Sequence, residues 1–273
     1  MFMKKVRLDM LLVERGLLDT REKAKRTIMA GLVFSEQVRL DKPGVKVDEN
    51  IPIEIKGRAI PYVSRGGLKL EKALHEFDVS VRDKVVIDIG SSTGGFTDCA
   101  LQNGARLSYA IDVGYNQLDW KLRSDERVVV MEKTNFRYVT EEQLKLGKPN
   151  FATIDVSFIS LRIILPVLKN LLLENSDVVA LIKPQFEAGR EQVGKKGIVR
   201  ESKIHRQVLR DMLEFAVKEG YLVKALTFSP ITGGEGNIEF LVHLSWNHAE
   251  GSISPSVNIN DTVDEAHDTL KKN

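Results

Sequence analysis

Cysteine is almost absent from this sequence, which has a single one, Cys99, among 273 residues. A lone cysteine excludes an intrachain disulfide and leaves a cysteine-based zinc site without enough ligands. Cys99 falls in a segment that we predict to be helical, where a buried structural thiol is the expected role. We therefore predict neither a disulfide nor a metal site.

Long hydrophobic runs are absent as well. No apolar stretch approaches the roughly 18 residues that a membrane-spanning helix needs. Near the amino terminus Asp9, Glu14 and Arg15 interrupt the apolar stretch that a signal peptide would require. The sequence therefore favours a cytoplasmic protein that has no membrane partner.

The net charge of +2 is unevenly distributed along the chain. Residues 1–70 have 15 Lys and Arg against 9 Asp and Glu, whereas residues 71–248 have 23 against 24. Residues 249–273 are acidic and polar, with 2 basic residues against 5 acidic ones. A basic amino-terminal region can dock on phosphates, although an ordinary solvated surface explains the charge equally well.

The first 60 residues have the pattern of a small α+β unit. Leucines at helical spacing predict a helix that ends at Gly16, and Thr20 is the expected N-cap of a second helix, Arg21–Ala30. Short β-type segments follow at residues 32–35, 37–40 and 51–55. Because a unit of this size buries only a small core, we interpret it as a binding module. Its candidate phosphate contacts are Arg21, Lys25 and Arg26.

A linker is predicted at residues 61–67, where Pro61, Gly66 and Gly67 break the pattern. From residue 68 to 247 the chain alternates between strand-like and helical segments, which predicts a doubly wound α/β sheet. The predicted strands are 85–89, 107–113, 127–132, 151–156 and 178–183, followed by a hairpin of 222–228 and 238–246 at the sheet edge. Helices are predicted at 96–103, 116–123, 141–146, 161–174 and 202–219. The polar residues 248–273 are predicted to form a flexible acidic tail.

A glycine-rich loop follows the first predicted strand, in the sequence VVIDIGSSTGGFTD. Its G-x-x-x-G-G spacing differs from the G-x-G-x-x-G of dinucleotide enzymes. Asp112 ends the next strand, where a carboxylate can accept hydrogen bonds from both hydroxyls of a ribose. This set is typical of enzymes that use S-adenosylmethionine, although any strand-to-helix turn can contain glycine. The predicted cofactor contacts are Asp88, Gly90, Ser91, Gly94, Gly95, Phe96, Asp112 and Asn135.

Asp155 and Lys183 follow the fourth and fifth predicted strands, so both should lie beside the glycine-rich loop. An ammonium at the end of an apolar strand is unusual because its unpaired burial is expensive. A lysine in such a place can accept or orient a proton from a weakly acidic hydroxyl. The alternative is a buried Lys–Asp pair that only holds the strand ends together. Taken alone, Lys69 and Glu239 have the pattern of surface charges.

The sequence closely resembles the TlyA family, called haemolysin A in older usage. The resemblance covers residues 5–246 and rests on RLDMLLVERGL, YVSRGGLKL, DIGSSTGGFTDC, AIDVGYNQL, TIDVSFISL, LIKPQFE and GGEGNIEF. It implies an alpha-L RNA-binding domain joined to an FtsJ-like domain with a Rossmann-like methyltransferase fold. It also implies 2'-O-methylation of cytidines in ribosomal RNA, with S-adenosylmethionine as the cofactor. The resemblance places a Lys-Asp-Lys-Glu catalytic tetrad on Lys69, Asp155, Lys183 and Glu239.

Two features differ from FtsJ proper: Ser91-Ser92-Thr93 replaces an Ala-Pro-type stretch, and Asn135 stands where an Asp could contact adenine. A cluster of basic residues between 183 and 210 suits an RNA path beside the active site. With the resemblance, the candidate RNA contacts are Arg21, Lys25, Arg26, Arg65, Lys195, Lys196 and Arg200. The expected partner is ribosomal RNA or a ribosomal subunit.

Three other functions remain open at this point. A membrane-active haemolysin would need an export signal and an amphipathic or spanning segment. A non-catalytic RNA-binding protein would not need all four tetrad positions, which are occupied here. A dinucleotide-dependent oxidoreductase is disfavoured by the spacing of the glycine loop.

Overall fold

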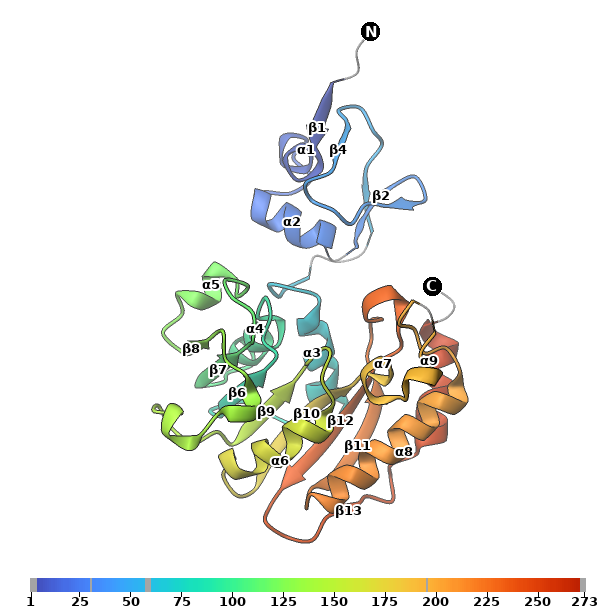
Figure 1. Cartoon of the computed structure of the whole chain (residues 1–273). Helices are drawn as coiled ribbons and strands as arrows, with labels where there is room; N and C mark the ends of the chain where they lie inside the picture. Colours follow the sequence, from blue (N-terminus) through green and yellow to red (C-terminus); the bar gives the residue numbers. More distant parts are fainter. Residues whose placement is uncertain (1–3, 30, 57–59, 195, 271–273) are drawn as a thin grey trace. The chain divides into compact units, whose positions relative to one another are not determined.

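The computed structural model describes residues 4–29, 31–56, 60–194 and 196–270. The chain divides into two compact units, residues 1–65 and 66–273 (Figure 1). Each unit is described by itself below.

The first unit consists of two helices and two small sheets. Helices α1 (Leu8–Glu14) and α2 (Arg21–Met29) pack on a core that includes Leu8, Leu12 and Ile28, all fully buried. Thr20 Oγ1 accepts a hydrogen bond from the Lys23 amide, so it caps α2 as predicted. The strands are β1 (Lys5–Arg7) paired with β4 (Lys46–Asp48), and β2 (Val33–Ser35) paired with β3 (Val38–Arg39) and β5 (Glu54–Ile55).

An eight-stranded sheet forms the centre of the second unit, with the strand order β13-β11-β12-β10-β9-β6-β7-β8. The strands β8, β7, β6, β9 and β10 run parallel, and β12 runs antiparallel to its neighbours β10 and β11. The strands span β6 (Val85–Ile89), β7 (Leu107–Ile111), β8 (Val128–Met131), β9 (Phe151–Ile154), β10 (Ser176–Ile182), β11 (Leu222–Phe228), β12 (Phe240–Trp246) and β13 (Ser252–Ile253).

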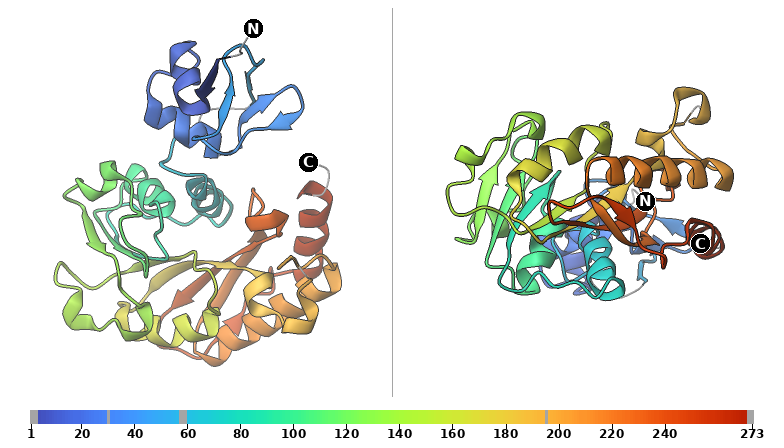
Figure 2. Two further views of the ribbon diagram at one scale, coloured as in Figure 1. Left: turned by 45° about the horizontal axis from the view of Figure 1, so that its top comes forward. Right: turned by 90° about the horizontal axis from the view of Figure 1, so that it is seen from below.

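Helices cover both faces of this sheet, with α6 and α8 on one face and α3 and α4 on the other (Figure 2). Apolar residues of α6 and α8 pack on β6, β7, β10 and β12 in one continuous core. The helices span α3 (Gly66–Glu76), α4 (Gly95–Gln102), α5 (Trp120–Arg123), α6 (Leu161–Leu171), α7 (Pro184–Glu187), α8 (Ser202–Lys218) and α9 (Ile259–Leu270). Single 3₁₀ turns lie at Phe136–Tyr138, Glu141–Gln143, Arg190–Gln192 and Gly234–Gly236.

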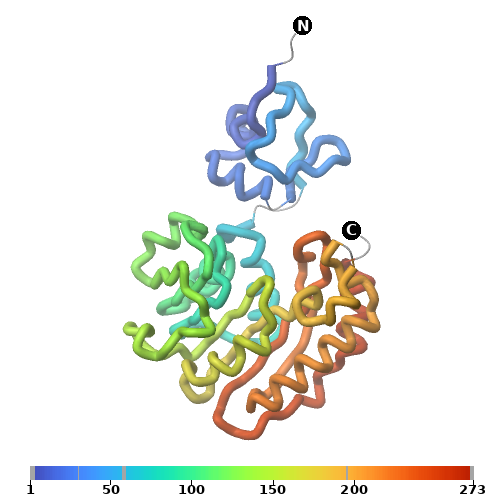
Figure 3. The backbone as a smooth tube through the Cα atoms, viewed as in Figure 1, coloured from blue at the N-terminus to red at the C-terminus, as the bar shows by residue number. Residues whose placement is uncertain are grey.

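The strand order reverses at β6, which fixes where a ligand can bind. From β6 the chain winds outward through β7 to β8, then crosses back to β9 on the other side of β6 and continues to β10 (Figure 3). In doubly wound sheets the loops at the carboxyl ends of the strands diverge at this point and leave a crevice. The glycine-rich loop after β6 and the loop after β9 therefore border the same space.

Two predictions about domain organisation are wrong. Gly66 and Gly67, assigned to the linker, instead begin helix α3, because a first helical turn tolerates glycine where packing supports the helix. Residues 248–273 were expected to be a flexible tail, but they contain β13, which pairs with β11, and the 12-residue helix α9. Val263 and Ala266 of α9 are completely buried in the main core.

Two predicted helices are also shorter than expected. The segment 116–123 is helical only over Trp120–Arg123, and the segment 141–146 contains a 3₁₀ turn at Glu141–Gln143. In the first case Asn116 has a φ of +56°, and Asp119 is the N-cap, accepting from the Lys121 amide, so the helix begins only at Trp120.

Candidate active site

A cavity of about 470 Å³ lies at the carboxyl ends of β6, β7 and β9. Its size is in the range of small-molecule and cofactor sites, and apolar surface dominates its lining. The lining combines the glycine loop with the ends of the neighbouring strands. Among its members are Gly90, Ser92, Asp112, Gln117, Asn135, Asp155, Ser157 and Phe158.

Close backbone approach explains the first glycine of the loop. Gly90 has a φ of +85°, and a Cβ atom there would lie 2.6 Å from the Asp155 carbonyl oxygen. Both observations require glycine, because a side chain would separate the ends of β6 and β9. Gly90 thus brings the glycine-rich loop directly against the backbone of Asp155.

Asp112 is positioned at the end of β7 by two backbone amides. Its Oδ2 accepts from the Ser92 amide at 2.8 Å, and its Oδ1 accepts from the Gly114 amide at 2.7 Å. Each carboxylate oxygen has a further lone pair, so a ligand hydroxyl can still donate to either one. The carboxylate lies in the cavity lining, where it can contact a ribose.

Glu132 holds the loop that follows Asp112 in place. It accepts from the amides of Asn116, Gln117 and Leu118 and from the Arg123 guanidinium. Burial opposes ionisation, but these donors outweigh it and lower the pKa of Glu132 to about 2. The carboxylate thereby fixes Gln117, which lines the cavity.

The other predicted cofactor residues are placed differently. Asn135 lines the cavity, and its Oδ1 caps the following turn by accepting from the Arg137 amide. Asp88 does not reach the cavity lining: it is completely buried and accepts from Thr97 Oγ1 and Thr153 Oγ1, and burial raises its pKa to about 6. This carboxylate joins β6 to α4 and β9 instead. Ser91, Gly94, Gly95 and Phe96 form the turn and first residues of α4 behind the lining.

Four charged side chains from distant parts of the sequence meet beside the cavity. Lys183 Nζ lies 2.5 Å from Asp155 Oδ1, and Lys69 Nζ lies 3.2 Å from Asp155 Oδ2. Lys69 Nζ also contacts Glu239 Oε2 at 2.9 Å. The result is a continuous chain of alternating charges, Lys183–Asp155–Lys69–Glu239, of which Asp155 borders the cavity.

Burial and pairing together set the charge states in this cluster. Burial alone lowers the pKa of Lys69, but Asp155 and Glu239 outweigh it and hold that pKa above its usual value. Burial alone raises the pKa of Asp155, but Lys69 and Lys183 outweigh it and hold that pKa below its usual value. Lys69 is therefore cationic and Asp155 anionic near neutral pH.

Three further residues at this site were missed in the sequence. Ser157 Oγ accepts from Lys183 Nζ at 3.1 Å, and Gln185 Nε2 donates to Glu239 Oε1 at 3.2 Å. Phe158 is 91% exposed, has a φ of +62° and contacts the Phe186 ring at a centroid distance of 5.0 Å. Their positions next to Asp155 and Lys183 in the sequence were the available signal.

The candidate RNA contacts of the first unit are partly engaged in the fold. Arg21 Nε donates to Asp9 Oδ2 at 2.8 Å, and the completely buried Asp9 also pairs with Arg7. Lys25 pairs with Glu22 at 2.7 Å. Arg26 lines a small cavity with Thr20, Lys23, Thr27 and Ile60.

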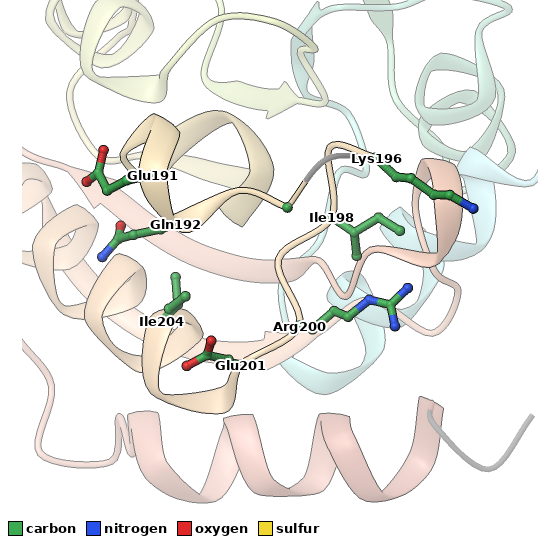
Figure 4. Close-up of a pocket in the computed structure, with 8 residues that line it drawn as sticks. Glu191, Gln192, Lys196, Ile198, Arg200, Glu201 and Ile204 are labelled. Atoms are coloured by element: carbon green, nitrogen blue, oxygen red, sulfur yellow. The ribbon is translucent and has the colours of Figure 1, made fainter.

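The candidate RNA contacts outside α2 differ in exposure. Arg65 is partly exposed, whereas Lys196 and Arg200 are exposed, and Lys195 lies outside the described residues. Lys196 and Arg200 belong to the rim of a second cavity, of about 420 Å³ (Figure 4). The predicted RNA contacts are thus spread over several surfaces.

The FtsJ-like methyltransferase model matches residues 62–246, and the S4 domain model matches residues 6–50. The first match covers strands β6 to β12, the cavity and all four charged residues. The chain belongs to the FtsJ-like methyltransferase family. The S4 match falls within the first unit.

Relatives place the chain with the TlyA members of that family. It is 68% identical over 271 residues to the Bacillus subtilis protein named "Putative rRNA methyltransferase YqxC", covering 98% of this chain and 96% of the relative. It is 38% identical over 244 residues to a Mycobacterium tuberculosis protein named "16S/23S rRNA (cytidine-2'-O)-methyltransferase TlyA", covering 88% and 90%. A solved structure from Streptococcus thermophilus, titled "Putative hemolysin", superposes with a TM-score of 0.80 at 56% identity, covering 99% and 98%.

Membrane-spanning helices and metal-binding groups are both absent from the described residues. Within residues 4–29, 31–56, 60–194 and 196–270, no helix has the length and apolar character needed to cross a membrane. The same part of the chain has no group of three or more His, Cys, Asp or Glu side chains arranged to hold a metal ion.

Proposed function

We propose that this chain transfers a methyl group from S-adenosylmethionine to a ribose 2'-hydroxyl of ribosomal RNA, at cytidines. The observation that supports this most strongly is the chain of ion pairs from Lys183 to Glu239, in which Asp155 also lines the cavity. The ribosomal substrate and the cytidine target are supported by the TlyA relative of Mycobacterium tuberculosis, whose name includes both. Such a substrate places the reaction in the cytoplasm.

The residues around the cavity fit S-adenosylmethionine. Asp112 offers a carboxylate at the end of β7 for the ribose hydroxyls, and Gly90 keeps the loop backbone close to the ligand. Gln117 and Asn135 add polar groups at the rim, where the adenine edge needs hydrogen bonds. When bound, S-adenosylmethionine would supply an activated methyl group on its sulfonium.

Lys183 is assigned to the proton of the 2'-hydroxyl. A hydroxyl that attacks a methyl group must lose its proton as the new bond forms, so a nearby base or proton organiser lowers the barrier. Asp155 and Ser157, which line the cavity, both bind Lys183 Nζ, while Lys69 and Glu239 fix the other side of Asp155. Lys183 thus accepts or orients the proton. The other three residues hold Lys183 and the acceptor ribose in place.

The exposed aromatic side chain beside the cluster suits an RNA substrate. Phe158 is held in the left-handed region, which is costly for an aromatic residue and is tolerated where a site needs it. Unpaired bases stack on exposed aromatic rings of RNA-binding proteins. We assign Phe158 to stacking on a base near the target, and Arg26, Arg65, Lys196 and Arg200 to phosphate contacts.

A paired assay tests this function against the haemolysin alternative. The purified chain is incubated with S-adenosylmethionine labelled on the methyl group and with ribosomal RNA or subunits from a strain that lacks the gene. The same preparation is added to dye-loaded liposomes. We expect label on RNA and no dye release. Dye release without methyl transfer would establish membrane activity in place of the proposed reaction.

A further inference from the structure

One buried side chain, Asn237, joins the loop of residues 189–200 to the turn that precedes Glu239. We call residues 189–200 the basic loop; of its cations, Arg190, Lys196 and Arg200 lie in the described part. Asn237 is 3% exposed, and its Nδ2 donates to the carbonyls of Gly197 at 2.9 Å and Gly234 at 3.0 Å. Its Oδ1 accepts from the Val199 amide at 3.0 Å. The amide therefore bonds to the basic loop on both of its polar ends.

The same side chain stands two residues before Glu239. Glu239 is fixed on both carboxylate oxygens, by Lys69 at 2.9 Å and by Gln185 at 3.2 Å. Gly233 donates to the Asn237 carbonyl at 2.8 Å, and a Cβ atom at Gly233 would lie 2.1 Å from Glu239 Oε1. The turn that Asn237 closes is therefore packed directly against the Glu239 carboxylate.

The basic loop is held from its other side by a histidine pair. His205 Nε2 lies 3.1 Å from the Val199 carbonyl, which can only accept, so this nitrogen carries the proton. His205 Nδ1 then accepts from His267 Nε2, 2.8 Å away on α9. Val199 is thus bound through its amide to Asn237 and through its carbonyl to His205. Helix α9 lies beyond the FtsJ-like match, which ends at residue 246.

The hydrogen bonds to Asn237 and His205 leave cations of the basic loop exposed to solvent. Lys196 and Arg200 are exposed, and in Figure 4 both side chains extend away from Glu191 and Gln192. A phosphate bound by these cations contacts a loop whose backbone is hydrogen-bonded to Asn237. Fully bonded polar groups in the interior rigidify the elements that they connect.

We propose that Asn237 is a positioning residue that links phosphate binding on the basic loop to the alignment of Glu239, and that His205 and His267 extend this support to α9. The proposal rests on the proposed function, because it needs an RNA substrate. Bound RNA then restricts the motion of the Glu239 carboxylate, which binds Lys69. Phosphate contacts therefore raise the rate of the chemical step as well as the affinity for RNA. A basic loop that only binds RNA would affect affinity alone.

A double-mutant cycle tests this link. The first change is Asn237→Asp, which keeps the size but replaces the donor to two carbonyls by an acceptor. The second is Lys196→Ala with Arg200→Ala, which removes two exposed cations of the basic loop. Single-turnover methyl transfer is measured at saturating RNA, with the RNA Kd and the cofactor Kd measured separately. Asn170→Asp is the matched control. Asn170 is exposed, and its Nδ2 donates to the Pro166 carbonyl on the same helix.

We expect each change to slow the saturated rate, and the cofactor Kd to stay within about twofold of wild type. In the Asn237→Asp background the cation change should alter only the RNA Kd, so the combined rate differs at least about threefold from the product of the single effects. Rate effects that multiply independently would overturn the link. Methyl transfer absent from the wild type would instead overturn the proposed function.

A second variant covers the case in which Asn237→Asp does not fold. His267→Ala removes the partly exposed end of the histidine pair and leaves Asn237 in place. Thermal melting identifies which variants are folded. We expect His267→Ala to reduce the dependence of the rate on Lys196 and Arg200 in the same direction. Wild-type dependence in a folded His267→Ala protein would show that α9 takes no part in the support.

Discussion

At the scale of single residues, the proposed mechanism depends most on Lys183. We expect Lys183→Ala to slow single-turnover methyl transfer by about 100- to 10,000-fold, the range for removal of a positioned acid or base. Asp155 keeps its bond to Lys69 in this variant, so the fold and cofactor affinity should be nearly unchanged. Lys183→Arg should be almost as slow, because a guanidinium stays protonated near neutral pH. Near-normal turnover in Lys183→Arg would reduce the role of this residue to a fixed positive charge.

Asp112 provides the corresponding test for the cofactor. Asp112→Ala removes the acceptor assigned to the ribose, which should weaken S-adenosylmethionine binding by about 1–3 kcal/mol in calorimetry. The Ser92 and Gly114 amides lose a partner as well, so the folded state of the variant is checked by circular dichroism. Unchanged cofactor affinity in a folded variant would mean that the ribose binds elsewhere.

The sequence predicted only some of these residues from physical argument. Asp155 and Lys183 follow from their positions at strand ends, since parallel strands direct their carboxyl ends to one edge. Lys69 and Glu239 came from the family resemblance alone, because nothing local in GGLKL or GGEGN distinguishes them from surface charges. The burial of Asp88 depends on Thr97 and Thr153, and such a contact across elements has no local signature.

At the scale of elements, the strands were the most predictable part. Strand 85–89 agrees with β6 residue for residue, because buried parallel strands are continuous apolar runs between polar loops. Helix α3 was missed since Gly66-Gly67 is a turn signal, and only packing against α4 makes it helical. Helix α9 was missed because its buried stripe consists of few apolar residues, among them Val263 and Ala266.

The packing of α9 gives an element-scale prediction. Val263→Asp places a charge in a completely buried position, which should destabilise the chain by more than about 2 kcal/mol in denaturant unfolding. Asp268→Asn, at an exposed position of the same helix, should change stability by less than about 0.5 kcal/mol. Equal stability of the two variants would mean that α9 does not stay docked in solution.

Helix α2 supplies the prediction for RNA docking. Arg21 supports the buried Asp9, so its removal would mix folding with binding. We therefore choose Lys25→Ala with Arg26→Ala, which should lower RNA affinity and reduce the slope of log affinity against log salt by about 0.7–0.9 per lost phosphate contact. Cofactor binding should be unaffected, because its cavity lies in the other unit. A double variant with the wild-type salt slope would exclude α2 from the RNA interface.

At the scale of the whole molecule, the chain combines an S4 domain with an FtsJ-like catalytic unit. The excess of positive charge lies in residues 1–70, whereas the catalytic unit is close to neutral. This division assigns much of the nonspecific phosphate attraction to the first unit and the chemistry to the second. In the proposed function, electrostatic attraction delivers the RNA, and the cavity and the four charged residues carry out methyl transfer.

The identity of the methylated nucleoside is the most direct test of this account. Ribosomal RNA from a strain lacking the gene is treated with the full chain and S-adenosylmethionine, digested to nucleosides and analysed by mass spectrometry. The account predicts 2'-O-methylcytidine with the wild-type chain and its near-complete loss with Lys183→Arg. A methyl group on a base, or undiminished 2'-O-methylcytidine with Lys183→Arg, would contradict it.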